Sequence, residues 1–220
     1  MVAEQPLARP EPPGRRPQAR KGDRQILREE ILAAAERLLV ETGSEDQVSI
    51  RAVASATGVT APSIYRHFED KTHLIFEVCA RQFERFDQAL AEAVADLEDP
   101  IDVLRATGRA YVRFGTEHPE HYRIMFMGPA YATPDQWEDL LATGSFAHLV
   151  ATIEAAVEAG ELDVVGDAFT TALHVWANIH GLTSPLVVRP TMPWTDLAGF
   201  IDDHLALVLR SHLKVDLPHR

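Results

Sequence analysis

Apolar residues recur at helical spacing along nearly the whole chain after residue 24, and no stretch shows the strict alternation typical of a β-strand. In the first such segment, the periodic positions share one face of a helix over about residues 25–42: Ile31, Ala34, Ala35, Leu38 and Leu39. Gly43 follows, and glycine readily takes the left-handed conformation that ends a helix. The pattern predicts an all-α fold with about nine helices in total.

Two short helices are predicted between residues 49 and 68, separated by a tight turn that contains Gly58. The first begins at Ser49, an N-cap type of residue, and its periodic positions are Ile50, Val53, Ala54 and Thr57. The second begins at Thr60, whose hydroxyl is expected to cap it. Pro62 fits the first turn of this helix, because the amides there lack intrahelical partners.

The second short helix has one apolar side and one polar side. Ile64 and Phe68, four residues apart, form a seam that packs against the two preceding helices. The remaining side chains face outward: Ser63, Tyr65, Arg66 and His67. A short helix, a glycine-containing turn and a second helix with a polar outer face form the helix-turn-helix pattern, whose second helix enters the major groove of DNA.

Six further helices are predicted in the rest of the chain, with proline or glycine at most of their boundaries. Pro100 opens one helix, Gly128 and Pro129 end a short apolar helix, and Pro134 begins a longer helix that ends at Gly160. The six predicted ranges are about 72–97, 100–118, 121–127, 134–160, 165–187 and 194–213.

The formal net charge of -12 is unevenly distributed. Residues 1–73 carry 11 basic and 11 acidic side chains, whereas residues 74–220 carry 10 and 22, so the negative excess lies entirely after the helix-turn-helix. A neutral head is compatible with DNA binding, which the net charge taken alone would exclude. Two interpretations of the acidic body stay open: a cationic or neutral small-molecule ligand, or repulsion that keeps this part away from DNA.

Composition divides the chain into four parts. Residues 1–23 are rich in proline and arginine, which predicts a disordered arm that either contacts DNA phosphate or is only solvated. The part with the helix-turn-helix over 24–73, a helical body over 74–215 and a tail over 216–220 follow. The single Cys79 excludes an intramolecular disulfide, and no apolar run suits a signal peptide or membrane span. We therefore expect a cytoplasmic protein without membrane contact, in which Cys79 is a small buried hydrophobe.

The region from the second predicted helix to the start of the fourth resembles the N-terminal DNA-binding domain of the tetracycline-repressor (TetR) family of bacterial transcriptional regulators. The resemblance is carried by Ile50-Arg51-Ala52-Val53-Ala54, Gly58-Val59-Thr60, Ser63-Ile64-Tyr65-Arg66-His67-Phe68, Lys71 and Leu74. It covers residues 25–75, about a quarter of the chain. The sequence departs from the commoner family pattern at Ala61-Pro62, where small or basic residues are frequent.

The residue types and the resemblance together predict the side chains that contact DNA. Hydroxyls, cations and helix N-terminal amides bind phosphate, whereas arginine reads the acceptor atoms of guanine. Phosphate contacts are expected from Ser49, Thr60, Tyr65, His67 and Lys71, and base contacts from Arg51 and Arg66. The full predicted set is Ser49, Arg51, Thr60, Ala61, Pro62, Ser63, Tyr65, Arg66, His67 and Lys71. Structural roles stay open as alternatives: caps for Ser49 and Thr60, ring packing for Tyr65 and His67, and a solvated turn at Lys71.

In the second domain, Trp176, His180 and Gly181 resemble the tryptophan-histidine-glycine signature of one TetR subgroup. The segment Tyr122-Arg123-Ile124-Met125-Phe126 resembles the middle of the same subgroup. The resemblance implies an all-helical effector-binding domain whose last two helices form a four-helix bundle with a second subunit. Such a homodimer would space two recognition helices about 34 to 36 Å apart, which suits successive major grooves of a pseudo-palindromic operator.

Aromatic and methionine side chains are more numerous in the second domain than a minimal helical core requires, which indicates a small-molecule effector pocket. The predicted lining is Phe83, Phe86, Tyr111, Phe114, Met125, Phe126, Trp137, Trp176 and His180. Core packing is the alternative for each residue taken singly. For His180 three roles stay open: a satisfied core histidine, a ligand contact, or a donor at the subunit interface.

An enzyme is the competing class of function. The chain has no GxGxxG, GxSxG or GxxxxGK motif. Two groups imitate metal sites without a further ligand at suitable spacing: Glu117-His118 with Glu120-His121, and Asp202-Asp203-His204. No catalytic residue, cofactor or metal is predicted. The expected function is a ligand-responsive, sequence-specific dimeric transcriptional regulator, most simply a repressor, and a helical dimer that binds ligand without DNA is a third class.

Overall fold

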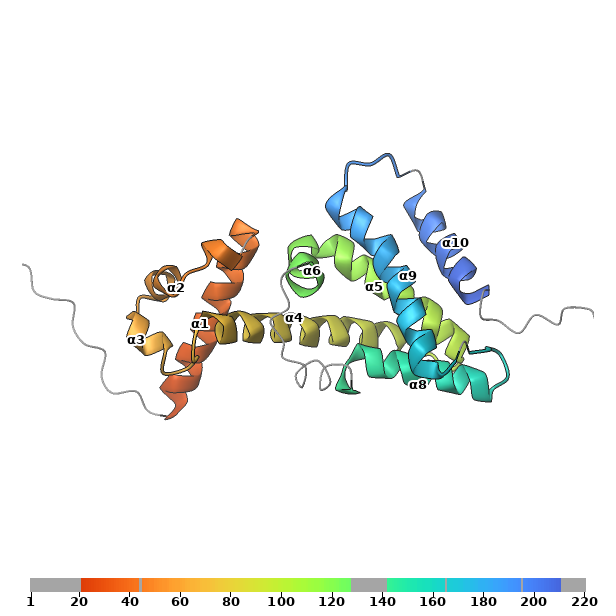
Figure 1. The fold of residues 1–220 in the computed structure, drawn as a ribbon, viewed down its shortest axis with the longest axis horizontal. Helices are drawn as coiled ribbons and strands as arrows, with labels where there is room; N and C mark the ends of the chain where they lie inside the picture. Colours follow the sequence, from red (N-terminus) through yellow and green to blue (C-terminus); the bar gives the residue numbers. More distant parts are fainter. Residues whose placement is uncertain (1–20, 44, 128–141, 165, 195, 211–220) are drawn as a thin grey trace, which may run out of the picture.

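The computed structural model describes residues 21–43, 45–127, 142–164, 166–194 and 196–210. These residues form nine α-helices, one short 3₁₀ helix and no β-sheet, which confirms the predicted all-α class. Figure 1 shows a small head at one end of the molecule and a larger body at the other. A single helix, α4 (Lys71–Val94), runs from the head into the body and belongs to both.

The head consists of α1 (Lys21–Thr42), η1 (Glu45–Gln47), α2 (Ile50–Thr57), α3 (Ala61–Ile64) and the first turns of α4. Its core contains the apolar positions that the helical period selects: Ile31, Leu32, Ala34, Ala35, Leu39, Val48, Val53, Ala54, Ile64, Phe68, Leu74, Ile75, Val78 and Cys79. Helix α1 begins at Lys21, so residues 21–23, which were assigned to the arm, are helical. Residues 1–20 of the arm lie outside the described residues.

The ends of the two short helices differ in how they are capped. The Ser49 hydroxyl accepts a hydrogen bond from the Ala52 amide at 3.1 Å, as predicted, and Gly58, which closes α2, takes the left-handed conformation with φ 65°. The predicted cap by the Thr60 hydroxyl is wrong, because that hydroxyl makes no bond to the helix backbone. It lies 3.1 Å from the Ser63 hydroxyl instead. Helix α3 ends at Ile64, but Phe68 is still buried through the turn that follows.

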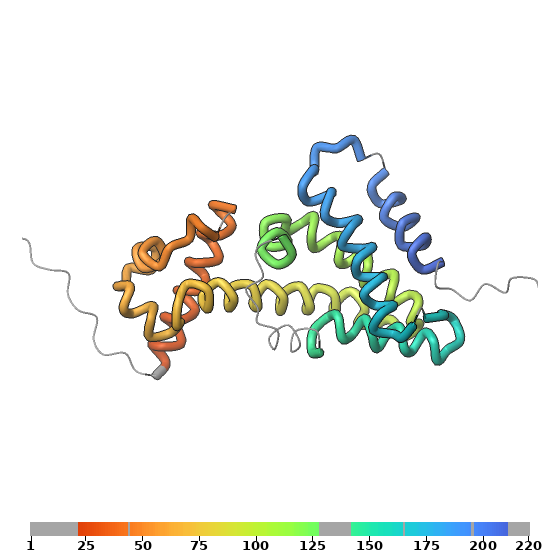
Figure 2. The backbone as a smooth tube through the Cα atoms, in the orientation of Figure 1, coloured from red at the N-terminus to blue at the C-terminus, as the bar shows by residue number. Residues whose placement is uncertain are grey.

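The body is built around α5 (Pro100–Glu117), which packs against α4 and the remaining helices: α6 (Pro119–Phe126), α8 (Ser145–Glu158), α9 (Ala168–Val188) and α10 (Leu197–Arg210). Figure 2 shows the chain folding back after α4, with α9 and α10 antiparallel at the side of the body away from α2 and α3. Within the described part of the chain, no helix combines the length and apolarity that crossing a bilayer requires.

Several boundaries in the body depart from the sequence-based prediction, and three of them bear on the cavity or the last two helices. The helix predicted over 134–160 is broken at Gly144, whose ψ of -162° is extended, so α8 begins only at Ser145. Pro134 itself lies outside the described residues. Helix α9 begins at Ala168 because the Asp167 carboxylate accepts from the Thr170 amide at 2.7 Å. Helix α10 begins at Leu197, three residues after the predicted start, and Asp196 accepts from the Gly199 amide at 3.0 Å.

Close packing in the body makes Gly115 a sensitive position. A Cβ atom added there would lie 2.5 Å from Cγ2 of Thr183 in α9 and 3.1 Å from the Tyr122 ring. Thr183 and Tyr122 are fully buried, and the Thr183 hydroxyl is bound to the Ile179 carbonyl, so neither side chain has room to yield. We expect Gly115→Ala to lower the free energy of unfolding by about 1–3 kcal/mol, measured by urea or thermal denaturation. Gly22→Ala, in α1 with open space around it, is the control and should leave stability within about 0.5 kcal/mol. Equal stability of both variants would contradict the packing argument.

Candidate DNA-binding surface and effector cavity

All the predicted DNA-contacting residues except Lys71, the first residue of α4, gather on α2, α3 and the turns beside them, at the end of the head remote from the body (Figure 1). Six of them are exposed: Ser49, Arg51, Thr60, Pro62, Tyr65 and Arg66. The other four are half-buried: Ala61, Ser63, His67 and Lys71. Tyr65 is 53 % exposed although it is a large aromatic residue. Packing within the head therefore does not explain why a tyrosine occupies this position.

Hydrogen bonds between side chains order the outer face of α3. The Thr60 and Ser63 hydroxyls are 3.1 Å apart, and Nη2 of Arg66 donates to the Ser63 hydroxyl at 2.9 Å. These contacts hold the Arg66 guanidinium across the outer face of the helix. Four of the five guanidinium N–H donors are left for other acceptors.

Three predicted DNA contacts also have structural roles. Ser49 caps α2, as described above. Nζ of Lys71 donates to the backbone carbonyl of Glu45 at 2.6 Å and so fastens the start of α4 to η1, which leaves two ammonium protons for other partners. Burial, together with the positive charges of Arg24, Arg66 and Arg28, lowers the pKa of His67, so its ring is neutral at physiological pH. His67 therefore offers a neutral ring nitrogen, whereas Lys71 offers a positive charge.

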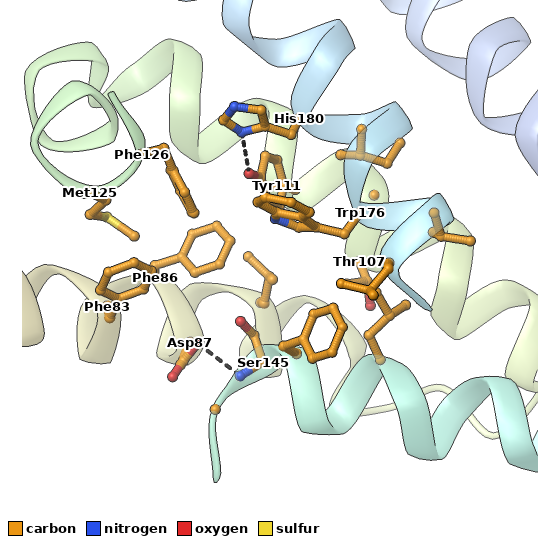
Figure 3. A pocket seen from close by; sticks show the side chains of 18 of the residues that line it. Phe83, Phe86, Asp87, Thr107, Tyr111, Met125, Phe126, Ser145, Trp176 and His180 are labelled. Carbon is orange, nitrogen blue, oxygen red and sulfur yellow. Dashed lines mark hydrogen bonds between the residues drawn. The ribbon is translucent and has the colours of Figure 1, made fainter. Parts of the chain in front are cut away.

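A cavity of about 420 Å³ lies in the body between α4, α5, α6, α8, α9 and α10. Seven of the predicted pocket residues line it: Phe83, Phe86, Tyr111, Met125, Phe126, Trp176 and His180 (Figure 3). Phe114 does not line the cavity. Its ring packs behind Phe86, with ring centroids 5.2 Å apart, so its inclusion was wrong. Trp137 lies outside the described residues.

Sequence reasoning missed several residues that line the cavity, among them Asp87, Thr107, Ser145, Phe146 and Leu149. Asp87 carried a signal, because it follows Phe83 by four residues and must share a face of α4 with it. Phe146 carried only its aromatic character, the general signal on which the pocket prediction rests. Ser145 carried none, since only the break at Gly144 and the packing of α8 bring the start of that helix to the cavity.

His180 is the centre of a polar cluster at one end of the cavity. Its Nδ1 lies 2.7 Å from the Tyr122 hydroxyl and 3.2 Å from the Tyr111 hydroxyl, and its ring stacks on Trp176 at 5.3 Å between centroids. Burial raises the pKa of Tyr122 to about 12 and that of Tyr111 further, so both hydroxyls stay protonated. Nδ1 of His180 is thus engaged within the protein, and the same ring lines the cavity.

The burial of His180 predicts a pH dependence. Burial lowers its pKa below the ordinary value, so the unfolded state binds the proton more readily than the native state. Its contribution to stability is fully present above the unfolded pKa of about 6.5 and falls as the pH drops below that value toward the native pKa. We expect His180→Gln, which keeps polar groups but does not titrate, to flatten the fall in free energy of unfolding between about pH 7 and 5. An unchanged slope in urea titrations across this range would contradict the assignment.

Ion pairs connect the head to the body. Oε1 of Glu36 in α1 accepts from Nη1 of Arg85 in α4 at 2.5 Å and lies 3.3 Å from Nε2 of His121 in α6. Burial raises the pKa of Glu36, but the hydrogen bonds and charges of Arg85 and His121 outweigh it, so its pKa lies below the ordinary value. Arg28 pairs with Glu77 at 2.7 Å, and Arg81 pairs with Glu29. The head is therefore fixed to both α4 and α6, and α6 also lines the cavity.

The described residues contain no cluster of three His, Cys, Asp or Glu side chains placed to hold a metal ion. His121, one member of the group that imitates a metal site in the sequence, pairs with Glu36 instead. Cys79 is 7 % exposed, and burial together with the nearby Glu45 charge raises its pKa to about 12. The thiol is accordingly protonated and behaves as a small apolar group.

Two family models match the chain, and both describe regulators. One, for bacterial regulatory proteins of the tetR family, matches residues 31–78, which include the helix-turn-helix. The other, for the tetracyclin repressor-like C-terminal domain, matches residues 104–208, which include most of the cavity. The chain belongs to the TetR family. This TetR-family protein is therefore a DNA-binding transcriptional regulator, and no enzyme family is indicated.

Curated relatives and solved structures resemble the chain over most of its length. The transcriptional regulator AcrR of Shigella flexneri is 27% identical over 203 residues, which cover 88% of this chain and 92% of AcrR. A Rhodococcus sp. RHA1 protein of unknown function is 27% identical, with a TM-score of 0.72 over 86% of this chain and 96% of that one. Bacillus subtilis FadR, solved in complex with stearoyl-CoA, has a TM-score of 0.68 at 14% identity over 82% of this chain and 97% of FadR, which shows a shared fold.

Proposed function

We propose that this TetR-family regulator is a homodimeric repressor that leaves its operator when a small molecule enters the cavity. The observation that carries the proposal is the double role of α4. Its first turns bury Leu74, Ile75 and Val78 in the core of the head, and later turns place Phe83 and Phe86 on the cavity. The same continuous helix therefore packs into the head that carries the DNA-contacting residues and lines the cavity.

Apolar exposure on α9 and α10 supports a homodimer through these helices. A row of exposed apolar or small side chains lies on one side of α9: Phe169, Leu173, Ala177 and Gly181 are four residues apart, and Val188 follows two turns later. Helix α10 adds Phe200 and Leu207, which are 44 % and 67 % exposed. Gly181 has open space around it, which lets a second helix approach closely. Contiguous exposed apolar surface of this kind favours association. The same face includes Gly181 of the Trp-His-Gly signature. We therefore also propose that the protein belongs to the TetR subgroup with this signature.

Helix α6 supplies a second route between the sites. Met125 and Phe126 line the cavity, while His121 on the same helix contacts Glu36 of the head. A ligand that displaces Phe126 therefore also changes the position of His121 relative to α1. The ligand shifts the balance between the DNA-competent and released states only as far as its affinities for the two states differ.

On the DNA side, the proposal keeps the residues predicted from the sequence. The exposed Tyr65 contacts phosphate, Arg51 and Arg66 reach base edges, and Lys71 adds a phosphate contact through its remaining protons. A two-fold pair of heads reads a pseudo-palindromic operator, and the regulator acts on DNA in the cytoplasm with no catalytic step.

Gel-shift titration with the DNA that flanks its own gene tests this function. The expected result is tight binding to one pseudo-palindromic site, weakened by salt, with release by a small molecule found in a thermal-shift screen. Binding of small molecules by a protein with no sequence-specific DNA affinity would refute the repressor and favour a ligand-binding dimer.

A further inference from the structure

The polar groups around the cavity are unequally available to a ligand. At one end, the hydroxyls of Tyr111 and Tyr122 are engaged with Nδ1 of His180, whose ring is covered by Trp176. Burial lowers the pKa of His180, so this end carries no charge at neutral pH. A ligand gains little from the two hydroxyls or from Nδ1, because these atoms already bond to one another.

The other end of the cavity contains a carboxylate. Figure 3 shows Asp87 beside Ser145, across the cavity from His180. Oδ1 of Asp87 accepts from the Ser145 amide at 3.0 Å, and this is the one hydrogen bond that its carboxylate makes with the described residues. Because a carboxylate has about four acceptor positions, the single bond leaves most of its capacity free.

No positive charge balances Asp87 within the described lining of the cavity. That lining contains neither Lys nor Arg, and Asp87 is its one acidic residue. The rest of the wall is mainly apolar and aromatic, including Phe83, Phe86, Phe126 and Trp176. The negative faces of such rings attract cations as well as apolar groups.

From this arrangement we propose that the effector is a lipophilic cation, an amine whose ammonium pairs with Asp87 while its apolar part packs on the aromatic wall. The inference rests on the proposed effector function of the same cavity and adds the chemical class of the ligand. A volume of about 420 Å³ suits a molecule of drug size. An anionic ligand, such as a coenzyme A thioester, would place its charge beside an unbalanced carboxylate, which is unfavourable. Of the two interpretations of the acidic body, the proposal takes the one with a cationic ligand.

Three fluorescent probes that share one ring system and differ in charge test the inference: dansylcadaverine (cation), dansylamide (neutral) and dansylglycine (anion). Their dissociation constants are measured by fluorescence enhancement with the full chain. We expect dansylcadaverine to bind at least about tenfold more tightly than dansylamide, and dansylglycine to bind most weakly.

Asp87→Asn is the decisive variant, because an asparagine oxygen still accepts from the Ser145 amide while the charge is lost. It should weaken dansylcadaverine binding by about tenfold and leave dansylamide within about twofold. Glu84→Gln, an exposed residue less than one turn away on α4, is the matched control and should change neither value. Equal affinity for the three probes, a cation preference that survives in Asp87→Asn, or no binding of any probe would overturn the inference. Gel shifts on the same samples separate this outcome from failure of the regulator, since specific operator binding by wild type and Asp87→Asn does not depend on the charge of the ligand.

Discussion

Replacing Tyr65 by alanine is expected to reduce operator affinity by about a hundredfold without lowering stability. Tyr65 is 53 % exposed, and its side chain lies at the end of α3, so the truncation removes little buried surface. A hydrogen bond to a charged group such as phosphate contributes about 1.5 kcal/mol at the low end of the usual range. A homodimer makes the contact twice, which gives about 3 kcal/mol, or about two orders of magnitude in the dissociation constant.

Tyr65→Phe distinguishes the hydroxyl from the ring. If the hydroxyl binds phosphate, the phenylalanine variant should lose nearly as much affinity as the alanine variant in the same gel-shift titration. If the ring packs on the DNA sugar instead, Tyr65→Phe should bind like wild type. Thermal denaturation of both variants should match wild type, and wild-type affinity of Tyr65→Ala would remove Tyr65 from the interface.

The second large effect is expected at the other end of the molecule, where Leu207→Glu should convert the homodimer into monomers. Leu207 is 67 % exposed on α10, so a charge there has no consequence for an isolated subunit. In a four-helix interface the new carboxylate would lose its hydration without gaining a partner. This would destabilise the dimer by roughly several kcal/mol per subunit. Light scattering after size exclusion should show a mass near 24.4 kDa, and operator binding should fall by more than about a hundredfold, because a monomer reads one half-site.

Leu97→Glu is the control for this variant. Leu97 is also a leucine with an exposed side chain, at 39 %, but it lies in the turn after α4 and outside α9 and α10. It should stay dimeric and bind the operator normally. A dimeric Leu207→Glu protein would place the interface elsewhere on the surface.

Local signals determined the architecture of the head. The apolar period of α1 and α2, the Ser49 cap and the left-handed Gly58 are properties of short segments, and the structure has all of them. Prediction failed where two local options were close in energy. The Thr60 hydroxyl was free to cap α3, but it bonds to Ser63, whose hydroxyl also holds Arg66. Such competition between side-chain partners depends on coordinates that a residue pattern does not contain.

In the body, the number of aromatic and methionine side chains predicted a pocket, and seven of the residues named for it line the cavity. Phe114 was assigned to the pocket because an aromatic residue on the inner face of a helix can either line a cavity or pack against a neighbouring ring. The residue pattern does not distinguish these two positions. The ring of Phe86 stands between Phe114 and the cavity. The break at Gly144 was missed because a single glycine within an apolar segment does not reveal whether the helix continues.

The sequence by itself determined the helical class, the helix-turn-helix and its outward-facing side chains, since these follow from the spacing of neighbours along the chain. Tertiary structure alone decided which residues from distant segments meet. It joined Glu36, Arg85 and His121 at the junction of head and body, closed His180 into a cluster with two tyrosines, and set Asp87 against the first amide of α8. These contacts join residues 49 to 85 positions apart, where one helix meets another in an orientation that packing of the whole core selects. The total charge of the body was therefore visible in the sequence, but the single carboxylate that faces the cavity was not.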